Sequence, residues 1–95
     1  MRKLSKDEAV DLAERDEARR AGVEPGRVRV ASTTDTEFPN SALGAPRPGE
    51  MSADMMTPGW TIRVDAGSLS LEYRAAPRQV RLVGFDGGTH QVFPD

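Results

Sequence analysis

A chain of 95 residues with 29% charged residues and a net charge of −2 is long enough for one modest core. We therefore expect a single globular domain over residues 1–95. The slight negative charge argues against binding driven by general attraction to nucleic acid or anionic lipid. Because the chain has no cysteine, disulfides and thiolate chemistry are excluded.

The sequence predicts no membrane span, because it lacks a run of about 20 apolar residues. The N-terminal segment becomes charged after Leu4, where a signal peptide would continue with apolar residues. We expect a cytoplasmic protein as the sequence is written. An extracytoplasmic location stays open if the N-terminus was processed or truncated.

The N-terminal segment predicts a helix over about 6–21. Ser5 and Glu8 have the spacing of a capping box, in which each side chain satisfies a backbone N–H at the start of a helix. Gly22 suits the left-handed position that ends one. A narrow stripe of small and aliphatic residues can lie close against a sheet. It consists of Ala9, Val10, Leu12, Ala13 and Ala21.

The charged residues of this helix are expected to face solvent. Asp11 with Arg15, and Asp16 with Arg20, have the i,i+4 spacing of favourable ion pairs. Such a solvated face is the ordinary interpretation of the helical carboxylates, which are Asp7, Glu8, Asp11, Glu14, Asp16 and Glu17.

Four segments alternate apolar and polar residues with the period of half-buried strands. They span about 27–33, 60–66, 69–75 and 79–84. Turn residues at 67–68 and at Pro77 separate the last three, which therefore predict an antiparallel meander. THQVF, at 89–93, predicts a short last strand or a docked tail. The pattern indicates an α+β fold in which one helix packs across an antiparallel sheet of three to five strands.

The segment FPNSALGAPRPGEMSADMMTPG, residues 38–59, predicts a long crossover loop. Loops beyond about 12–15 residues are uncommon in compact domains unless they are functional or disordered. Its prolines and glycines restrict the backbone and bend it. We interpret its large apolar residues as packing back onto the domain: Phe38, Leu43, Met51, Met55, Met56 and the following Trp60. Three alternatives stay open, namely a cover for an edge of the sheet, a preformed binding loop and a disordered segment.

Several motifs carry a family resemblance. FPNSALGAPRPGEM at 38–51, TPGWTIRV at 57–64 and LEYR at 71–74 resemble a small bacterial domain of unknown function. The resemblance covers roughly residues 5–83. It implies an α+β domain loosely similar to PepSY-like or cystatin-like folds, and it brings no catalytic residue or ligand.

The residues that carry catalysis in other proteins are sparse. His90 is the only histidine, so arrangements of several histidines are excluded, and we interpret it as an exposed side chain. Asp35, Glu37, Glu50 and Asp54 flank or lie in the loop but lack the spacing of a calcium-binding loop. The sequence predicts no enzyme, no cofactor and no metal site.

Five arginines are expected on one exposed face of the sheet, where they could bind nucleic acid or an anionic ligand. They are Arg27, Arg29, Arg63, Arg74 and Arg81. A face neutralised by salt bridges with Asp65 and Glu72 is the alternative. Aromatic residues for stacking are scarce, so nucleic acid is an improbable partner.

We predict a non-catalytic module that binds another protein through its constrained loop. A more specific version of this prediction is a module similar to a peptidase inhibitor. The residues expected to contact the partner are Leu43, Pro46, Arg47, Pro48, Glu50, Met51, Met55 and Met56. Binding of nucleic acid or an anionic ligand to the arginine face is the alternative. A monomer or weak dimer is expected.

Overall fold

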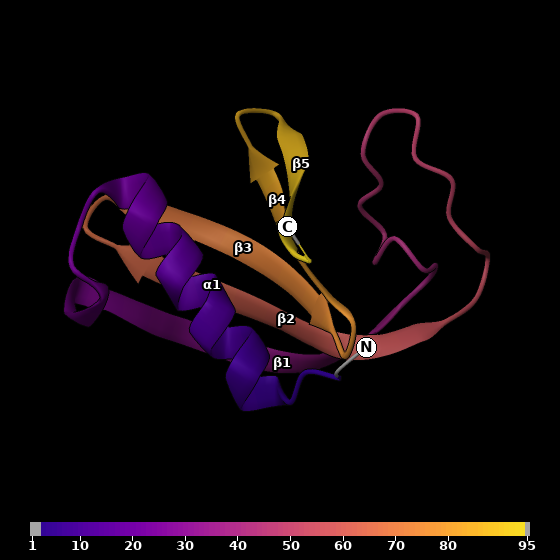
Figure 1. Cartoon of the computed structure of the whole chain (residues 1–95), viewed down its shortest axis with the longest axis horizontal. Helices are drawn as coiled ribbons and strands as arrows, with labels where there is room; N and C mark the ends of the chain where they lie inside the picture. The colour runs from indigo at the N-terminus through magenta and orange to yellow at the C-terminus, as the bar shows by residue number, and fades with distance from the viewer. Residues whose placement is uncertain (1–2, 95) are drawn as a thin grey trace.

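The computed structural model describes residues 3–94 and consists of one helix laid across a five-stranded antiparallel sheet (Figure 1). The strands follow one another in the order β1-β2-β3-β4-β5, as a meander. This confirms the predicted α+β fold, and THQVF lies in the fifth strand. The elements are α1 (Lys6–Ala21), the 3-10 turn η1 (Pro25–Arg27), β1 (Val28–Phe38), β2 (Thr57–Ala66), β3 (Leu69–Ala76), β4 (Gln79–Phe85) and β5 (Gly88–Phe93).

The capping residues define α1 as the sequence predicts. The Ser5 side chain accepts a hydrogen bond from the Glu8 backbone N–H, and the Glu8 carboxylate accepts one from Ser5 N–H. Gly22 ends the helix in the left-handed conformation, with φ of 68°. No helix in the described part of the chain is long and apolar enough to cross a membrane.

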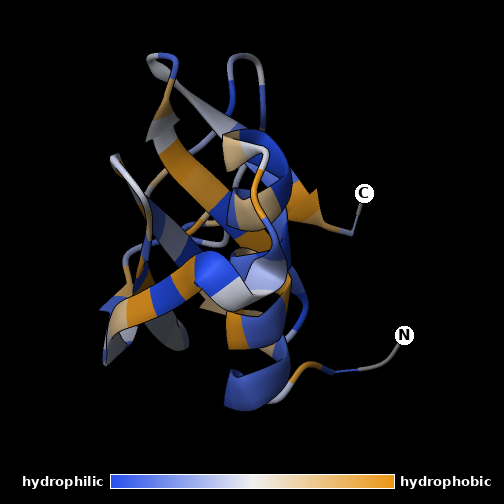
Figure 2. Cartoon of the chain, turned by 90° about the vertical axis from the view of Figure 1, so that its left-hand side faces the viewer, coloured by the Kyte–Doolittle hydropathy of each residue, from blue (hydrophilic) through white to orange (hydrophobic). Residues whose placement is uncertain are grey.

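The main core lies between α1 and one face of the sheet. Ala9 and Ala13 are fully buried, and these small residues let the helix lie close to the strands. The apolar residues of the strands alternate with polar ones, as the hydropathy colours of Figure 2 show. The sheet contributes the largest core side chains, among them Ile62, Val64, Leu71, Tyr73, Val80 and Leu82.

Two helix carboxylates correct the prediction of a solvated charged face. Asp16 is 2% exposed and Glu17 is fully buried. Asp16 is satisfied, because it accepts hydrogen bonds from Arg19 Nη2 and Arg20 Nε, each at 2.7 Å, and from Tyr73 Oη at 2.8 Å. Neither carboxylate oxygen of Glu17 has a hydrogen-bond partner among the described residues. The helical pattern fails here because α1 lies so close to the sheet that its buried stripe includes these two positions.

The structure also corrects the bounds of the first two strands. β1 and β2 continue to pair beyond the alternating segments, through Thr36 with Gly59 and Phe38 with Thr57. The crossover loop is therefore shorter than predicted and comprises residues 39–56. Gly59 fits this region because an added Cβ would lie only 2.0 Å from the carbonyl oxygen of Ala75.

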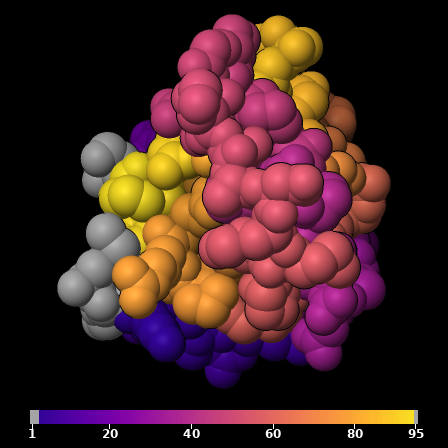
Figure 3. Space-filling view, turned by 90° about the vertical axis from the view of Figure 1, so that its right-hand side faces the viewer, coloured from indigo at the N-terminus to yellow at the C-terminus, as the bar shows by residue number. Residues whose placement is uncertain are grey.

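The loop packs against the sheet face opposite α1. Phe38, Leu43 and Ala76 form a second buried cluster there, separate from the main core. Leu43 is fully buried, and Ala42 and Ala45 beside it are also buried. The loop covers much of the face shown in Figure 3, close to the β4–β5 hairpin. The loop is thus packed against the sheet around Leu43, whereas residues 46–49 and 51–56 are exposed.

Candidate functional site

Two arginines of the sheet hold the first half of the loop. Arg74 Nη1 donates a hydrogen bond of 3.0 Å to the carbonyl oxygen of Leu43, and Arg81 Nη1 donates one of 3.1 Å to that of Ala45. Both arginines alternate with core residues along their strands, so their side chains extend from the face opposite α1. These two main-chain carbonyls belong to buried residues of the loop, and the arginines give each of them a hydrogen-bond donor.

Glu50 fastens the second half of the loop to the same strand. Its two carboxylate oxygens accept hydrogen bonds from Arg81 Nη1 and Nη2, each at 2.6 Å, and Oε1 also accepts one from Arg47 N–H at 2.9 Å. The hydrogen bond from Arg81 is the main reason why the pKa of Glu50 is lowered to about 2, and the Arg47 backbone N–H adds to it. Arg81 itself is 3% exposed. The ion pair is therefore well shielded from water on its arginine side.

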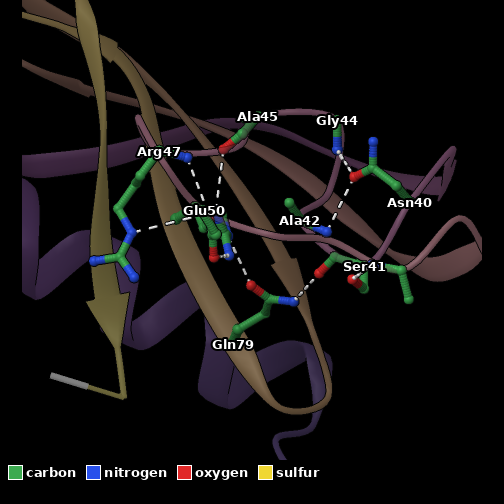
Figure 4. Close-up of polar contacts among 10 residues, drawn as sticks. Asn40, Ser41, Ala42, Gly44, Ala45, Arg47, Glu50 and Gln79 are labelled. Atoms are coloured by element: carbon green, nitrogen blue, oxygen red, sulfur yellow. Dashed lines mark hydrogen bonds and ion pairs between the residues drawn. The ribbon is translucent and has the colours of Figure 1, made fainter.

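Ser41 joins the two arms of the loop and also contacts Gln79 of β4 (Figure 4). Its N–H donates to the Ala53 carbonyl at 3.0 Å, and its hydroxyl oxygen accepts from Ala53 N–H at 2.7 Å. Gln79 Nε2 donates to the Ser41 carbonyl at 2.7 Å, and Gln79 Oε1 accepts from Arg81 Nε at 2.7 Å. A continuous network thus connects Ala53, Ser41, Gln79, Arg81 and Glu50.

A tight turn at the start of the loop sets the position of Leu43. The Asn40 side-chain oxygen accepts hydrogen bonds from the N–H groups of Ala42 and Gly44, each at 3.0 Å. Leu43 has φ of 56°, a left-handed conformation that leucine rarely adopts. Burial of its side chain and the hydrogen bond from Arg74 to its carbonyl hold it there.

Three methionines of the loop are exposed, which corrects the interpretation that they pack onto the domain. Met51 is 94% exposed, and Met55 and Met56 are 59% and 60% exposed. The space beneath the loop is taken by Leu43, Phe38 and the arginine side chains, so the methionines have no core to fill. We call Met51, Met55 and Met56 the exposed methionines.

The remaining residues of the predicted contact set divide into two groups. Pro46, Arg47 and Pro48 are exposed. Leu43 is buried, and the Glu50 side chain, 20% exposed, is occupied by Arg81. Leu43 and Glu50 therefore support the loop from beneath, whereas the other six residues present its surface.

The five arginines expected on one exposed face have different environments. Arg81 is buried, and Arg74 is half-buried against Glu72 and Leu43. Arg63 is exposed but forms an ion pair of 3.0 Å with Glu72. Arg27 and Arg29 are exposed. The loop and Glu72 thus engage three of the five guanidinium groups.

The described residues offer little else for catalysis. His90 is partly buried, which differs from the exposed side chain expected, and its Nε2 lies 2.9 Å from the carbonyl oxygen of Phe85. Residues 3–94 contain no cluster of three or more His, Cys, Asp or Glu side chains that could hold a metal ion. The candidate site considered below is the surface of the loop, which the sheet arginines hold and which carries the exposed methionines.

Sequence reasoning missed the polar residues that hold the loop in place, namely Asn40, Ser41 and Gln79. The Pro-Asn-Ser sequence is a turn signal that could have indicated Asn40 and Ser41. Gln79 gives no such signal, because its role depends on the approach of Ser41, which lies 38 residues earlier in the chain.

A model of the family described as "Domain of unknown function (DUF8738)" matches residues 10–83. The match includes most of α1, the loop and strands β1 to β3, and it extends into β4. Neither the curated proteins nor the solved structures contain a significant match to this chain.

Proposed function

For this chain, which belongs to the DUF8738 family of unknown function, we propose the role of a non-catalytic protein-binding module. The exposed methionines are the proposed contact surface, and an apolar surface of another protein is the proposed partner. The observation that carries the proposal is that the same loop is held by the sheet and yet exposes three large apolar side chains.

The fastening of the loop supports binding because a loop already held in one conformation loses little entropy when a partner engages it. Hydrogen bonds from Arg74, Arg81 and Gln79 reach its first half, and the Arg81 ion pair with Glu50 reaches its second. Methionine side chains are flexible and polarizable, so they adapt to apolar surfaces of different form. Exposed apolar groups of this kind are typical of interaction sites.

The narrower form of the proposal is a peptidase-inhibitor-like module, for which the support is a small domain with a constrained loop that is exposed in part. In that form the loop occupies the active-site cleft of a protease without being cut quickly. Incubation with serine, cysteine and metalloproteases, following both protease activity and the intact mass of this chain, tests the narrower form. Inhibition of one class supports it, and cleavage confined to residues 39–56 contradicts it.

The broader proposal is tested with a variant in which Met51, Met55 and Met56 are all replaced by serine. Because the three side chains are exposed, the variant is expected to keep the unfolding temperature of the wild type. Immobilised wild type should retain a protein from an extract of the source cells. An excess of free wild type should release that protein. Equal retention by the triple variant would contradict the proposal.

The arginine face receives less support as an alternative. Arg63, Arg74 and Arg81 already contact carboxylates of this chain, so they offer fewer free donors to phosphates. We therefore do not propose nucleic-acid binding on that face.

A further inference from the structure

Two adjoining hollows border β5, and no acidic residue lines either of them. Arg20, near the end of α1, and Arg47, in the loop, line the first hollow together with Thr89, His90 and Gln91. Arg47 and Thr89 also line the second hollow, which extends between the loop and the β4–β5 turn. We call the two hollows together the β5 groove.

The charge of the β5 groove contrasts with that of the hollow beside β1 and β2. There Asp35 and Glu37 lie next to Trp60, and no basic residue lines the hollow. The charged residues that line the β5 groove are thus all basic, whereas Asp7, Glu8 and Asp11, together with Arg15, line a hollow beside Phe93 at the other end of β5. An anionic ligand is favoured at the β5 groove and disfavoured at the other end of the sheet.

Both arginines of the first hollow keep hydrogen-bond donors for a ligand. Arg20 donates to Asp16 through Nε, and no further hydrogen bond involves its guanidinium among residues 3–94. The Arg47 side chain is 46% exposed, and its Nε lies 3.9 Å from Glu50 Oε1. That oxygen already accepts hydrogen bonds from Arg81 and from Arg47 N–H, so it leaves the Arg47 guanidinium largely unengaged.

β5 is the last strand of the meander, so its outer edge has no neighbouring strand in the described structure. An unpaired edge presents main-chain N–H and C=O groups to which an extended segment can add as a further strand. Residues 89–91 of β5 are the ones that line the first hollow. The donors of the arginines and the open edge therefore meet at the same place.

Arg20 and Arg47 approach this edge from opposite faces of the sheet. α1 packs on one face and contacts β5, whereas the loop is bound on the other face through Arg81, the β4 residue that pairs with Gln91. Successive side chains of a strand point to opposite faces. Two adjacent acidic residues of an added strand would therefore direct one carboxylate to Arg20 and the other to Arg47.

We propose that the β5 groove binds an extended acidic segment of another protein, which adds to β5 as a sixth strand and places adjacent carboxylates on Arg20 and Arg47. This surface is distinct from the exposed methionines and goes beyond the function proposed for them. Nucleic acid is the less favoured ligand, because the unpaired N–H and C=O groups of a strand edge match those of another extended main chain, and a nucleotide backbone has no such alternating groups.

The experiment measures fluorescence anisotropy of labelled eight-residue peptides against the full chain at low salt. The probe is Ser-Thr-Val-Glu-Glu-Val-Thr-Ser, with a Gln-Gln counterpart and a peptide whose two Glu are separated by one Val. We expect the adjacent pair to bind about threefold or more tighter than the separated pair, which has the same charge, and the Gln-Gln peptide to bind most weakly. In an NMR titration, the amide shifts should be concentrated in residues 88–93.

Arg47→Gln should weaken binding of the probe about fivefold or more, and Arg20→Gln should do the same. If Arg20→Gln disturbs folding because it removes the contact with Asp16, the Arg47→Gln variant decides the test. Arg27→Gln is the matched control, since Arg27 is exposed and lies outside the groove, and it should leave binding unchanged.

Three results would overturn the proposal. One is the absence of saturable binding at about 1 mM peptide, the weak end of the affinity scale. Another is equal affinity for the acidic and Gln-Gln peptides, and the third is tighter binding of a twelve-nucleotide oligothymidine than of the probe. None of these results depends on the exposed methionines, so the two proposals fail or hold separately.

Discussion

Arg81 and Glu50 form a two-point ion pair in which both nitrogen–oxygen distances are 2.6 Å, although 31 residues separate them in the chain. The pair connects β4, on the sheet face opposite α1, to the second half of the loop. Since the Arg81 guanidinium is buried, the pair is expected to affect both the stability of the domain and the order of the loop.

Replacement of Glu50 by Gln should lower the free energy of unfolding by roughly 2–4 kcal/mol, because it leaves the Arg81 charge buried without its partner. It should also speed proteolytic cleavage within residues 39–56. Urea denaturation and limited proteolysis measure the two effects. Arg63→Ala is the control, since it removes an exposed ion pair with Glu72 and should change stability by less than about 1 kcal/mol. Equal losses of stability in the two variants would show that the Arg81–Glu50 pair contributes no more to stability than an exposed ion pair.

The same pair predicts how stability falls in acid. The pKa of Glu50 is lowered to about 2 in the folded state, mainly by the hydrogen bond from Arg81, from an ordinary value of 4.5. Its contribution is therefore complete above pH 4.5 and is lost as the pH falls toward 2. The difference in melting temperature between wild type and Glu50→Gln should shrink across this interval. A difference that stays constant from pH 6 to about pH 2 would contradict the assignment.

The local features of this fold were predictable because neighbouring residues determine them. Ser5, Glu8 and Gly22 indicate the ends of α1 through hydrogen bonds within a few residues. The alternation in β2 to β4 likewise gives the correct core face, including Tyr73 and Leu71. These patterns were sufficient to derive the α+β fold.

The contacts of the loop could not be derived in the same way, because they join distant parts of the chain. Met51 looks like a core residue in the sequence, and it is exposed because Leu43 and the sheet arginines already fill the space beneath the loop. The burial of Glu17 depends on how closely α1 approaches the sheet. Both outcomes follow from three-dimensional packing, which no local pattern encodes.

Glu17 predicts a loss of stability as the pH rises. Its carboxylate is buried without a hydrogen-bond partner in the described structure, and desolvation, followed by the charges of Asp65 and Asp16, raises its pKa from 4.5 to about 7. The folded state thus retains a proton that the unfolded state loses between pH 4.5 and 7.

The wild type should therefore lose about 2–3 kcal/mol of stability between pH 4.5 and pH 8, and Glu17→Leu should remove most of that dependence. Urea denaturation at several pH values provides the measurement. Asp7→Asn, at an exposed position of the same helix, is the control and should keep the slope of the wild type. A Glu17→Leu variant with an unchanged slope would assign the pH dependence to other groups.

The hydrogen bond between Tyr73 and Asp16 predicts a further loss of stability. Tyr73→Phe removes the hydroxyl that donates at 2.8 Å to Asp16 Oδ2, while Arg20 Nε still donates to the same oxygen. Because the buried Asp16 carboxylate loses one of its hydrogen bonds, the free energy of unfolding should fall by about 1–2 kcal/mol. The ring is kept, so the near-UV circular dichroism of Trp60 should be preserved, while the contribution of Tyr73, the one tyrosine of the chain, is lost. A neutral effect, measured by urea denaturation, would mean that Arg19 and Arg20 alone satisfy Asp16.

The close approach of β2 to β3 at Gly59 gives the sharpest steric prediction. Gly59→Ala would place Cβ 2.0 Å from the Ala75 carbonyl oxygen, a backbone atom that cannot rotate away, so the strands must separate. The expected loss is about 2–3 kcal/mol or more, typical of overpacking in a core. Gly26→Ala is a matched control, since an added Cβ there meets no atom within 4 Å and the residue does not require a left-handed conformation. Because β2 follows directly after the loop, Gly59→Ala should also increase proteolytic cleavage within residues 39–56. Equal stability of the Gly59→Ala and Gly26→Ala variants would contradict the close packing of β2 against Ala75.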